Sequence, residues 1–126
     1  HNLLRDVEKR QSLQFFQLKK ALCEEVIPSL DSMYLAIKSG EEMKLGEKEK
    51  AWMDGIAGIL ANLEKSFEGI GLKQYWPKKG DNFDSSMHEA VAVVENGESG
   101  KIFDVLQPGY ILDDTVVRQA RVVVSK

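Results

Sequence analysis

The feature that most constrains this chain is a change in the spacing of its apolar residues near residue 71. Before that point, apolar side chains recur at three- and four-residue steps, which is the spacing of one face of an α-helix. After it, they come in short β-branched runs separated by turn residues, which is typical of short strands. The sequence therefore predicts an α+β fold, with a helical region over residues 1–71 and a small all-β module over residues 72–126.

The helical region is predicted to begin with one long helix and one short helix. The first covers about residues 2–25 and would be more than about 30 Å long at ~1.5 Å per residue. A domain this small cannot cover such a helix, so we expect a partner chain to bury part of it. Pro28 cannot donate a backbone hydrogen bond and predicts a break or a kink. A second, short helix should follow and end at Ser39-Gly40.

A third helix has the most regular apolar stripe in the chain. Its steps of three and four keep one side turned toward neighbouring helices, so we predict that the stripe forms a dimer interface. Glycines in a helix interior cost about 1 kcal/mol each, and Gly55 and Gly58 therefore indicate that something packs close to the backbone there. The stripe residues expected to dimerise are Trp52, Ile56, Ile59, Leu63 and Phe67.

The second half of the chain predicts a small barrel or sandwich-like module of short strands. Turns are expected at Asn96-Gly97 through Gly100 and at Pro108-Gly109, because glycine and proline punctuate strands. The expected strands cover residues 72–75, 90–94, 102–106, 116–117 and 121–124.

Composition excludes several classes of protein. The formal net charge is −3, whereas a nucleic-acid-binding protein normally presents a basic face. No apolar run reaches the roughly 18–20 residues that a membrane span requires. Cys23 is the single cysteine and lies on an apolar helical stripe, so we expect a buried structural thiol and a reducing compartment. Nothing at the N-terminus resembles a signal peptide, and the chain begins inside an apolar-periodic segment, so we expect further residues to precede it.

The inventory of catalytic groups is small. His88 has no second histidine or cysteine at metal-ligand spacing, so we expect it to have a structural role. The carboxylate pairs Asp81/Asp84 and Asp113/Asp114 lie in predicted turns, where aspartate is favoured for local hydrogen bonding. The glycine-containing segment 97–100 lacks the Gly-Lys-Ser/Thr ending of a phosphate loop. We therefore expect no enzyme activity, no metal and no cofactor.

Longer motifs in the chain resemble the GrpE family. The family's C-terminal signature has an aromatic residue or Leu followed by Asp, then His or Met, then Ala, and Phe83–Val91 reads Phe-Asp-Ser-Ser-Met-His-Glu-Ala-Val. It continues with Gly-aromatic, an aliphatic-Arg pair and alternating valines, which match Gly109-Tyr110 and Val117–Val124. The helical half agrees, since it contains segments similar to the family's bundle helices and to its link into the β-module. These segments are Val26–Met33, Asp54–Ile56 and Ile70–Leu72.

The resemblance implies a fold and a function. GrpE-like proteins are homodimers in which a long helix pairs and two shorter helices per chain form a four-helix bundle. One small β-domain docks on the nucleotide-binding domain of a DnaK-type chaperone, opens its cleft and promotes ADP release during protein folding and the stress response. The resemblance also implies a bacterial cytoplasmic location in preference to the mitochondrial matrix. A coiled-coil homodimer whose β-module binds an unrelated protein remains the main alternative, and a small enzyme is the third.

The resemblance assigns particular residues to the chaperone interface. Each has a structural alternative: Leu106, Tyr110 and Val124 could be β-core, Gly109 could serve turn geometry, and Gly55 could serve helix packing. The full set expected to bind the chaperone is Arg118, Gly109, Tyr110, Leu106, Val124 and Gly55.

Two positions depart from the family pattern. Asp114-Thr115 stands where family members usually have Gly-Arg, and Pro108 stands where Lys or Gln is usual. The first departure removes one basic group, so Arg118 and Arg121 are the cations that remain near this surface. Arg118 could contact the chaperone, or it could brace the β-module internally, for example against Asp113 or Asp114.

Overall fold

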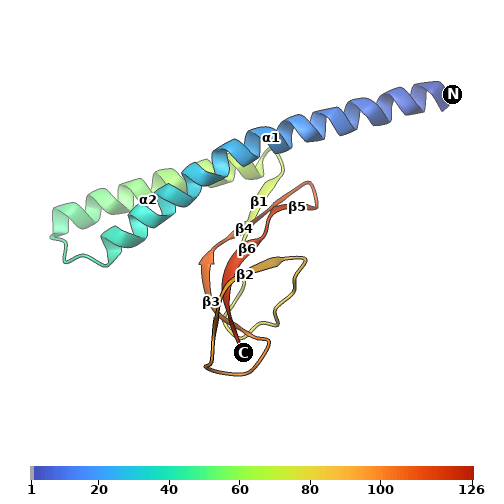
Figure 1. Ribbon diagram of the computed structural model, residues 1–126. Helices are drawn as coiled ribbons and strands as arrows, with labels where there is room; N and C mark the ends of the chain where they lie inside the picture. Colours follow the sequence, from blue (N-terminus) through green and yellow to red (C-terminus); the bar gives the residue numbers. More distant parts are fainter. Residues whose placement is uncertain (1) are drawn as a thin grey trace. The chain divides into compact units, whose positions relative to one another are not determined.

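The computed structural model describes residues 2–126, which form two helices followed by six strands (Figure 1). All helices precede all strands, so the α+β class predicted from the sequence is confirmed. The described chain divides into two compact units, one up to Met53 and one from Asp54 onward. The first unit contains α1 (Asn2–Glu41) and the first turns of α2 (Glu47–Glu68), and the second contains the rest of α2 and the strands.

Helix α1 continues through Pro28, so the predicted break there is wrong, and two helices replace the three that were expected (Figure 1). A proline inside a helix costs about 3 kcal/mol. Burying Ile27 and Leu30 contributes about 1.5–3 kcal/mol each, which offsets that cost. Pro28 itself lies on the exposed side of the helix, and so does Glu24, whose carbonyl loses its helical donor and can be hydrated instead.

The apolar stripe of α1 also continues across the proline. Cys23, which precedes Pro28, is buried, as its position on an apolar helical stripe predicted. Ile37, which follows Pro28, is buried as well. Ser32 donates a hydrogen bond from its hydroxyl to the Pro28 carbonyl, at 3.0 Å, within the same continuous helix. Other apolar residues of α1, such as Leu18 and Leu22, are exposed in the single chain, so their burial by a partner chain stays a prediction.

Helix α2 begins and ends with residues that suit helix termini. Glu47 and Glu49 lie in its first turn, where their charges favour the positive end of the helix dipole. At the other end the N–H of Gly71 donates to the carbonyl of Glu68 at 3.0 Å. Gly71 has a φ of 102°, a conformation that side-chain-bearing residues rarely adopt, so it stops the helix. Strand β1 follows immediately at Leu72.

The first sheet has the order β1-β4-β5, with both pairs antiparallel. Strand β4 was not predicted, because Pro108-Gly109 was expected to form a turn; the strand in fact starts at Gly109. Pro108 stands just before it, where the missing proline N–H removes no ladder bond. Asp113 and Asp114 form the two-residue turn into the next strand, with φ values of 46° and 70°. The strands are β1 (Leu72–Tyr75), β4 (Gly109–Leu112) and β5 (Thr115–Arg118).

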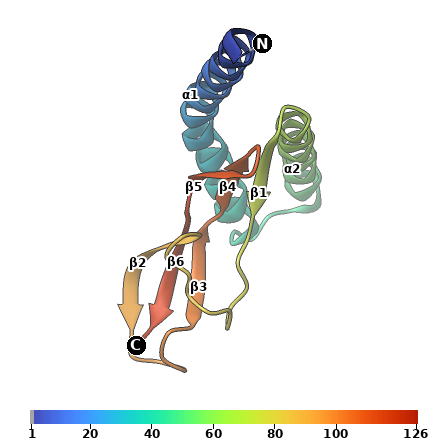
Figure 2. The ribbon, with the colours of Figure 1, turned by 90° about the vertical axis from the view of Figure 1, so that its right-hand side faces the viewer.

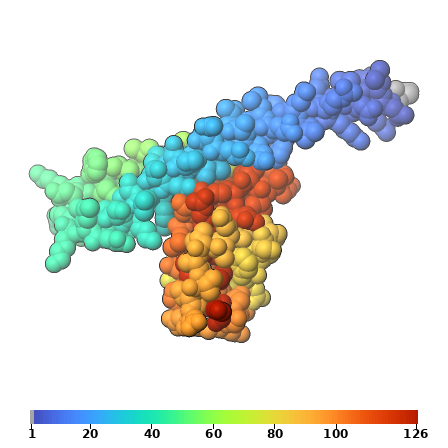
Figure 3. All heavy atoms as spheres, viewed as in Figure 1, coloured from blue at the N-terminus to red at the C-terminus, as the bar shows by residue number. Residues whose placement is uncertain are grey.

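The second sheet has the order β2-β6-β3, with β2 (His88–Val94) parallel to the central β6 (Ala120–Ser125) and β3 (Ile102–Gln107) antiparallel to it (Figure 2). Its core consists of buried Ile102, Ala120 and Val122. In the space-filling view the red atoms of the C-terminal residues lie among the orange atoms of the preceding segments (Figure 3). The strands expected at 90–94, 102–106 and 121–124 are confirmed to within a few residues.

Candidate functional site

The residues expected to bind a chaperone lie on four different strands of the second unit. Leu106 belongs to β3, Gly109 and Tyr110 to β4, Arg118 to β5 and Val124 to β6. Strand pairing places Tyr110 directly opposite Arg118. The sixth residue of the set, Gly55, lies on α2, is exposed, and has open space where a side chain would begin.

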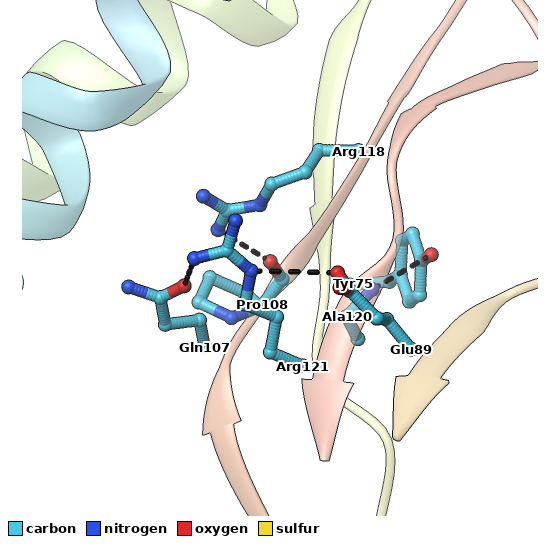
Figure 4. Close-up of polar contacts among 7 residues, drawn as sticks. All are labelled: Tyr75, Glu89, Gln107, Pro108, Arg118, Ala120 and Arg121. Carbon is cyan, nitrogen blue, oxygen red and sulfur yellow. Dashed lines mark hydrogen bonds and ion pairs between the residues drawn. The ribbon is translucent and has the colours of Figure 1, made fainter. Parts of the chain in front are cut away.

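Arg118 is held by strand β4 and by the residue that precedes it (Figure 4). One terminal guanidinium nitrogen donates to the carbonyl of Pro108 at 2.7 Å, and the guanidinium carbon lies 5.2 Å from the centre of the Tyr110 ring. The side chain is half-buried. Arg118 therefore has internal contacts, and those with Pro108 and Tyr110 hold it against the β-region.

Tyr110 lies in the core of the first sheet. Only 3% of the residue is exposed, and its hydroxyl accepts a hydrogen bond from the Gln74 side-chain amide at 3.1 Å. Its ring supports the Arg118 guanidinium on one side, an arrangement worth about 0.5–2 kcal/mol depending on how far the cation is desolvated. A partner protein would meet Tyr110 through Arg118 and not directly.

Gly109 leaves room for the ring of Tyr75. A side-chain carbon at position 109 would lie closer than 3.0 Å to two ring carbons and the hydroxyl oxygen of Tyr75, nearer than real carbon contacts come. The φ angle of Gly109 is not in the left-handed region, so its backbone would accept other residues. The requirement for glycine is therefore the close approach of an aromatic ring, and not the turn geometry that the sequence suggested.

Tyr75 links the two sheets and was not singled out from the sequence. Its hydroxyl donates to the Met87 carbonyl at 2.5 Å and accepts from the Ala120 N–H at 3.4 Å, so β1 is tied to the second sheet (Figure 4). Burial raises the pKa of the phenol because the charged form is poorly solvated there. Little in the sequence indicates this role for Tyr75. It is an aromatic residue at the end of a short strand, and its partner Gly109 lies 34 residues further along.

Arg121 joins all three strands of the second sheet at an exposed position. Its guanidinium donates to the Gln107 side-chain oxygen at 2.9 Å, and its Nε lies 3.5 Å from a Glu89 carboxylate oxygen (Figure 4). Exposed pairs of this kind contribute about 0–1 kcal/mol. Arg121 therefore holds little of the fold together, and its charge is accessible beside β3.

Apolar side chains are exposed along β3. Leu106 is 45% exposed, and Phe103 is exposed on the same strand, where the neighbouring Ile102 points into the core. Val124 is partly buried and packs against the core of the second sheet. Phe103 was missed because the run Ile102–Leu106 is apolar on both faces, and such a run does not reveal which residues point outward.

The apolar stripe of α2 is only partly covered. Trp52 and Ile59 are 68% and 67% exposed and lie seven residues apart, which places them on one face of the helix. Ile56, Leu63 and Phe67 are half-buried. A large apolar side chain that remains exposed in one chain is suited to contact with another protein.

The described residues hold no group of three or more His, Cys, Asp or Glu side chains that could bind a metal ion. None of the helices in residues 2–126 is both long enough and apolar enough to cross a membrane. The strand residues make hydrogen bonds, ion pairs, a cation–aromatic contact and apolar packing within the chain, and these contacts fix the positions of their side chains.

Comparison with known proteins identifies the family. A sequence profile of the GrpE family matches residues 1–126. The chain belongs to the GrpE family. A curated relative named Protein GrpE from Francisella philomiragia is 40% identical over 105 residues, which are 82% of this chain and 53% of the relative. Protein GrpE from Francisella tularensis subsp. novicida is 38% identical over 105 residues, or 82% of this chain and 52% of the relative. The chain thus spans about half the length of the curated relatives that it matches.

The Phe83–Val91 motif has a structural role. The Asp84 carboxylate accepts hydrogen bonds from the N–H and the hydroxyl of Ser86, at 2.9 and 2.7 Å, and so closes a tight turn before β2. These bonds stabilise the ionised form and lower the pKa of Asp84. His88 accepts a hydrogen bond from the Asp84 N–H at 3.0 Å, and its ring lies 5.9 Å from that of Phe83. His88 therefore fixes the turn, in agreement with the structural role expected for it.

Proposed function

We propose that this chain is the dimerisation and docking part of an adenyl-nucleotide exchange factor for a DnaK-type chaperone. The observation that carries the proposal is the match of the whole chain to the GrpE family. In this proposal the chain binds the chaperone's nucleotide-binding domain, favours its open cleft and promotes ADP release. Residues 1–71 would form the helical dimerisation region, and residues 72–126 would form the β-domain that docks.

The mechanism needs only a difference in affinity. A factor that binds the open cleft more tightly than the closed cleft shifts the equilibrium toward the open form by that difference in binding free energy. ADP then dissociates faster, and no covalent step takes place on the factor. A shift of about 2.7 kcal/mol, within the usual range of coupling energies, would change ADP affinity roughly 100-fold.

The proposed docking surface combines exposed apolar groups with positioned cations. Leu106 is the exposed one among the strand residues of the expected set, and Phe103 and Arg121 are accessible on or beside the same strand. Arg118 is anchored to Pro108 and to the Tyr110 ring, so it would lose little side-chain freedom on binding a chaperone carboxylate. Gly109, Tyr110 and Val124 would support this surface from beneath, and Gly55 would offer an open stretch of α2 backbone.

The proposed homodimer rests on the exposed face of α2. Trp52 and Ile59 would be buried against the second chain, with Ile56, Leu63 and Phe67 completing the stripe. Removing a large apolar side chain from water contributes about 1.5–3 kcal/mol, so several such residues per chain can hold a dimer at micromolar concentration.

The test is the release of fluorescently labelled ADP from a DnaK-type chaperone, measured by stopped flow with and without the chain. We expect faster release, and we expect Leu106→Ala to reduce the effect of a sub-saturating amount of factor about fivefold, the effect of losing roughly 1 kcal/mol of binding. Val93→Ala is the matched control, because Val93 is also an exposed apolar strand residue but lies on β2.

Three outcomes would count against the proposal. Release that does not accelerate even at a large excess of the chain would reject the exchange function. An equal loss in Leu106→Ala and Val93→Ala would reject the β3 surface. Light scattering that finds only monomer at micromolar concentration would reject the dimer.

A further inference from the structure

The loop between β2 and β3 carries the only asparagine in the chain that is followed by glycine, Asn96-Gly97. Both residues are exposed and lie outside the strands, at the end of the second sheet where the C-terminus also lies (Figure 2). Gly97 has a φ of 88°. A side-chain carbon there would also lie 3.2 Å from the Ser125 hydroxyl oxygen, so two constraints require glycine at position 97.

The geometry of this dipeptide suits an intramolecular reaction. In the described part of the chain, neither the Asn96 side-chain amide nor the Gly97 N–H takes part in a hydrogen bond. The attacking nitrogen belongs to Gly97, which has no side chain that could hinder its approach to the Asn96 Cγ atom. The exposed loop around Asn96 can change its backbone conformation at little free-energy cost, so the Gly97 nitrogen can reach the Asn96 Cγ atom.

We propose that Asn96 is a site of spontaneous deamidation that converts it to aspartate or isoaspartate. The Gly97 nitrogen forms a bond to Asn96 Cγ, the Cγ–Nδ2 bond breaks, and ammonia leaves with the proton from the backbone nitrogen. The product is a five-membered succinimide. One water molecule then opens the ring at either carbonyl, which gives aspartate or, with the main chain routed through Cγ, isoaspartate.

The remaining candidate positions in the same chain are protected by structure. Asn2 and Asn62 lie in helices and precede leucine, which hinders the attacking nitrogen. Asn82 precedes phenylalanine, and its side-chain oxygen accepts a hydrogen bond from Lys101. Asp54-Gly55 could form the same succinimide, but it lies inside α2, where the glycine N–H is committed to the helix. Asn96-Gly97 differs from Asp54-Gly55 both in its leaving group, which is ammonia and not water, and in the freedom of its backbone.

Deamidation would change the end of the second sheet. The new carboxylate would stand between Glu95 and Glu98 and change the net charge from −3 to −4. Isoaspartate also lengthens the main chain by one carbon between two anchoring hydrogen bonds. These are the Lys126 N–H to the Val94 carbonyl and the Gly100 N–H to the Ser125 carbonyl, each 2.9 Å long. We expect both to weaken, and hydrogen exchange of these two amides should then be faster.

The test is peptide mass spectrometry of the full chain after incubation in ¹⁸O-labelled water at mildly alkaline pH. We expect the peptide containing Asn96 to incorporate one ¹⁸O atom and to become a substrate for an isoaspartyl-specific carboxyl methyltransferase. Its rate should exceed that of the Asp54-containing peptide by at least about tenfold, because loss of ammonia from asparagine is faster than loss of water from aspartate and because the helix must open locally before Asp54 can react. Asn96→Gln, which would need a six-membered ring, should abolish the labelling and leave the circular dichroism spectrum unchanged.

A parallel incubation in denaturant decides whether the loop is open in the folded protein. Equal rates within about threefold in the folded and the denatured chain support the proposal. Protection of the Asn96 peptide by about tenfold or more in the folded chain would overturn it, since the loop would then hold the reactive groups apart. Labelling that persists in Asn96→Gln would place the reaction at another residue and would overturn it equally.

Discussion

Replacing Gly109 with alanine should destabilise the β-region by overpacking. The added methyl group would lie closer than 3.0 Å to two ring carbons and the hydroxyl oxygen of Tyr75. The ring cannot easily retreat, because its hydroxyl is tied to the Met87 carbonyl and to the Ala120 N–H. Overpacking of this kind costs typically 1–3 kcal/mol. The backbone of Gly109 contributes nothing to this penalty, since its φ is compatible with alanine.

The assay is urea unfolding followed by circular dichroism at a fixed chain concentration, because association with any partner chain would shift the midpoint. Gly58→Ala is the control: it lies on exposed helix with nothing within 4 Å of the new carbon, and it should stabilise by about 1 kcal/mol. The two glycine-to-alanine changes are therefore expected to have opposite signs.

A double-mutant cycle identifies the ring as the cause. Tyr75→Leu removes the crowding atoms, so Gly109→Ala should cost little in that background, and the coupling energy should be about 1–2 kcal/mol. Tyr75→Phe keeps the ring but removes the tethered hydroxyl, which is one of the three crowding atoms, so only part of the penalty should remain. If Gly109→Ala costs less than about 0.5 kcal/mol in the wild-type chain, or costs the same in the Tyr75→Leu background, the ring is not the constraint.

Three other changes test other parts of the structure. Asp114→Gly should raise the free energy of unfolding by about 1 kcal/mol, because a left-handed conformation costs a non-glycine residue roughly 1–2 kcal/mol, and a lower urea midpoint would contradict this. The lowered pKa of Asp84 means that its bonds to Ser86 stabilise the fold above about pH 3.9, the ordinary pKa of aspartate, and that this stability is lost as the pH falls through the folded-state value. Asp84→Ala should therefore be less stable than wild type at neutral pH and should approach it in acid, and a gap that does not close would refute the assignment. Under the proposed dimer, Ile59→Asp should shift sedimentation from dimer to monomer because a buried unpaired carboxylate is strongly disfavoured, whereas an unchanged dimer would remove Ile59 from the interface.

Periodicity predicted the elements well and their interruptions poorly. The change from helical to strand spacing near residue 71 coincides with the end of α2 and the start of β1 at Leu72. Helix α1 continues through Pro28 because the cost of the proline is local, whereas Cys23, Ile27 and Leu30 are buried on both sides of it. Pro108-Gly109 predicted a turn, but β4 begins at Gly109, because a proline immediately before a strand removes no hydrogen bond between strands.

The candidate site was less predictable than the fold, because burial within a strand depends on partners far away in the sequence. Tyr110 and Leu106 are both apolar strand residues, yet the first is buried beneath Arg118 and the second is exposed. No local pattern separates them. The contact between Gly109 and Tyr75 could not be predicted from the sequence either, because the two residues are 34 positions apart and neither residue type indicates the other as its neighbour.

The expected chaperone-binding residues divide into two physical groups, and the division changes what a mutation at each can show. Gly109 packs against Tyr75, and Arg118 contacts Tyr110 and Pro108. A substitution at any of these positions therefore alters packing within the first sheet, whatever its effect on a partner. Leu106 is exposed and makes no comparable contribution to the core. A loss of nucleotide exchange in Arg118→Ala is therefore ambiguous unless the melting temperature is unchanged, whereas the same loss in Leu106→Ala reports on binding directly. The exposed leucine, rather than the signature arginine, is the residue on which the proposed docking surface is best tested.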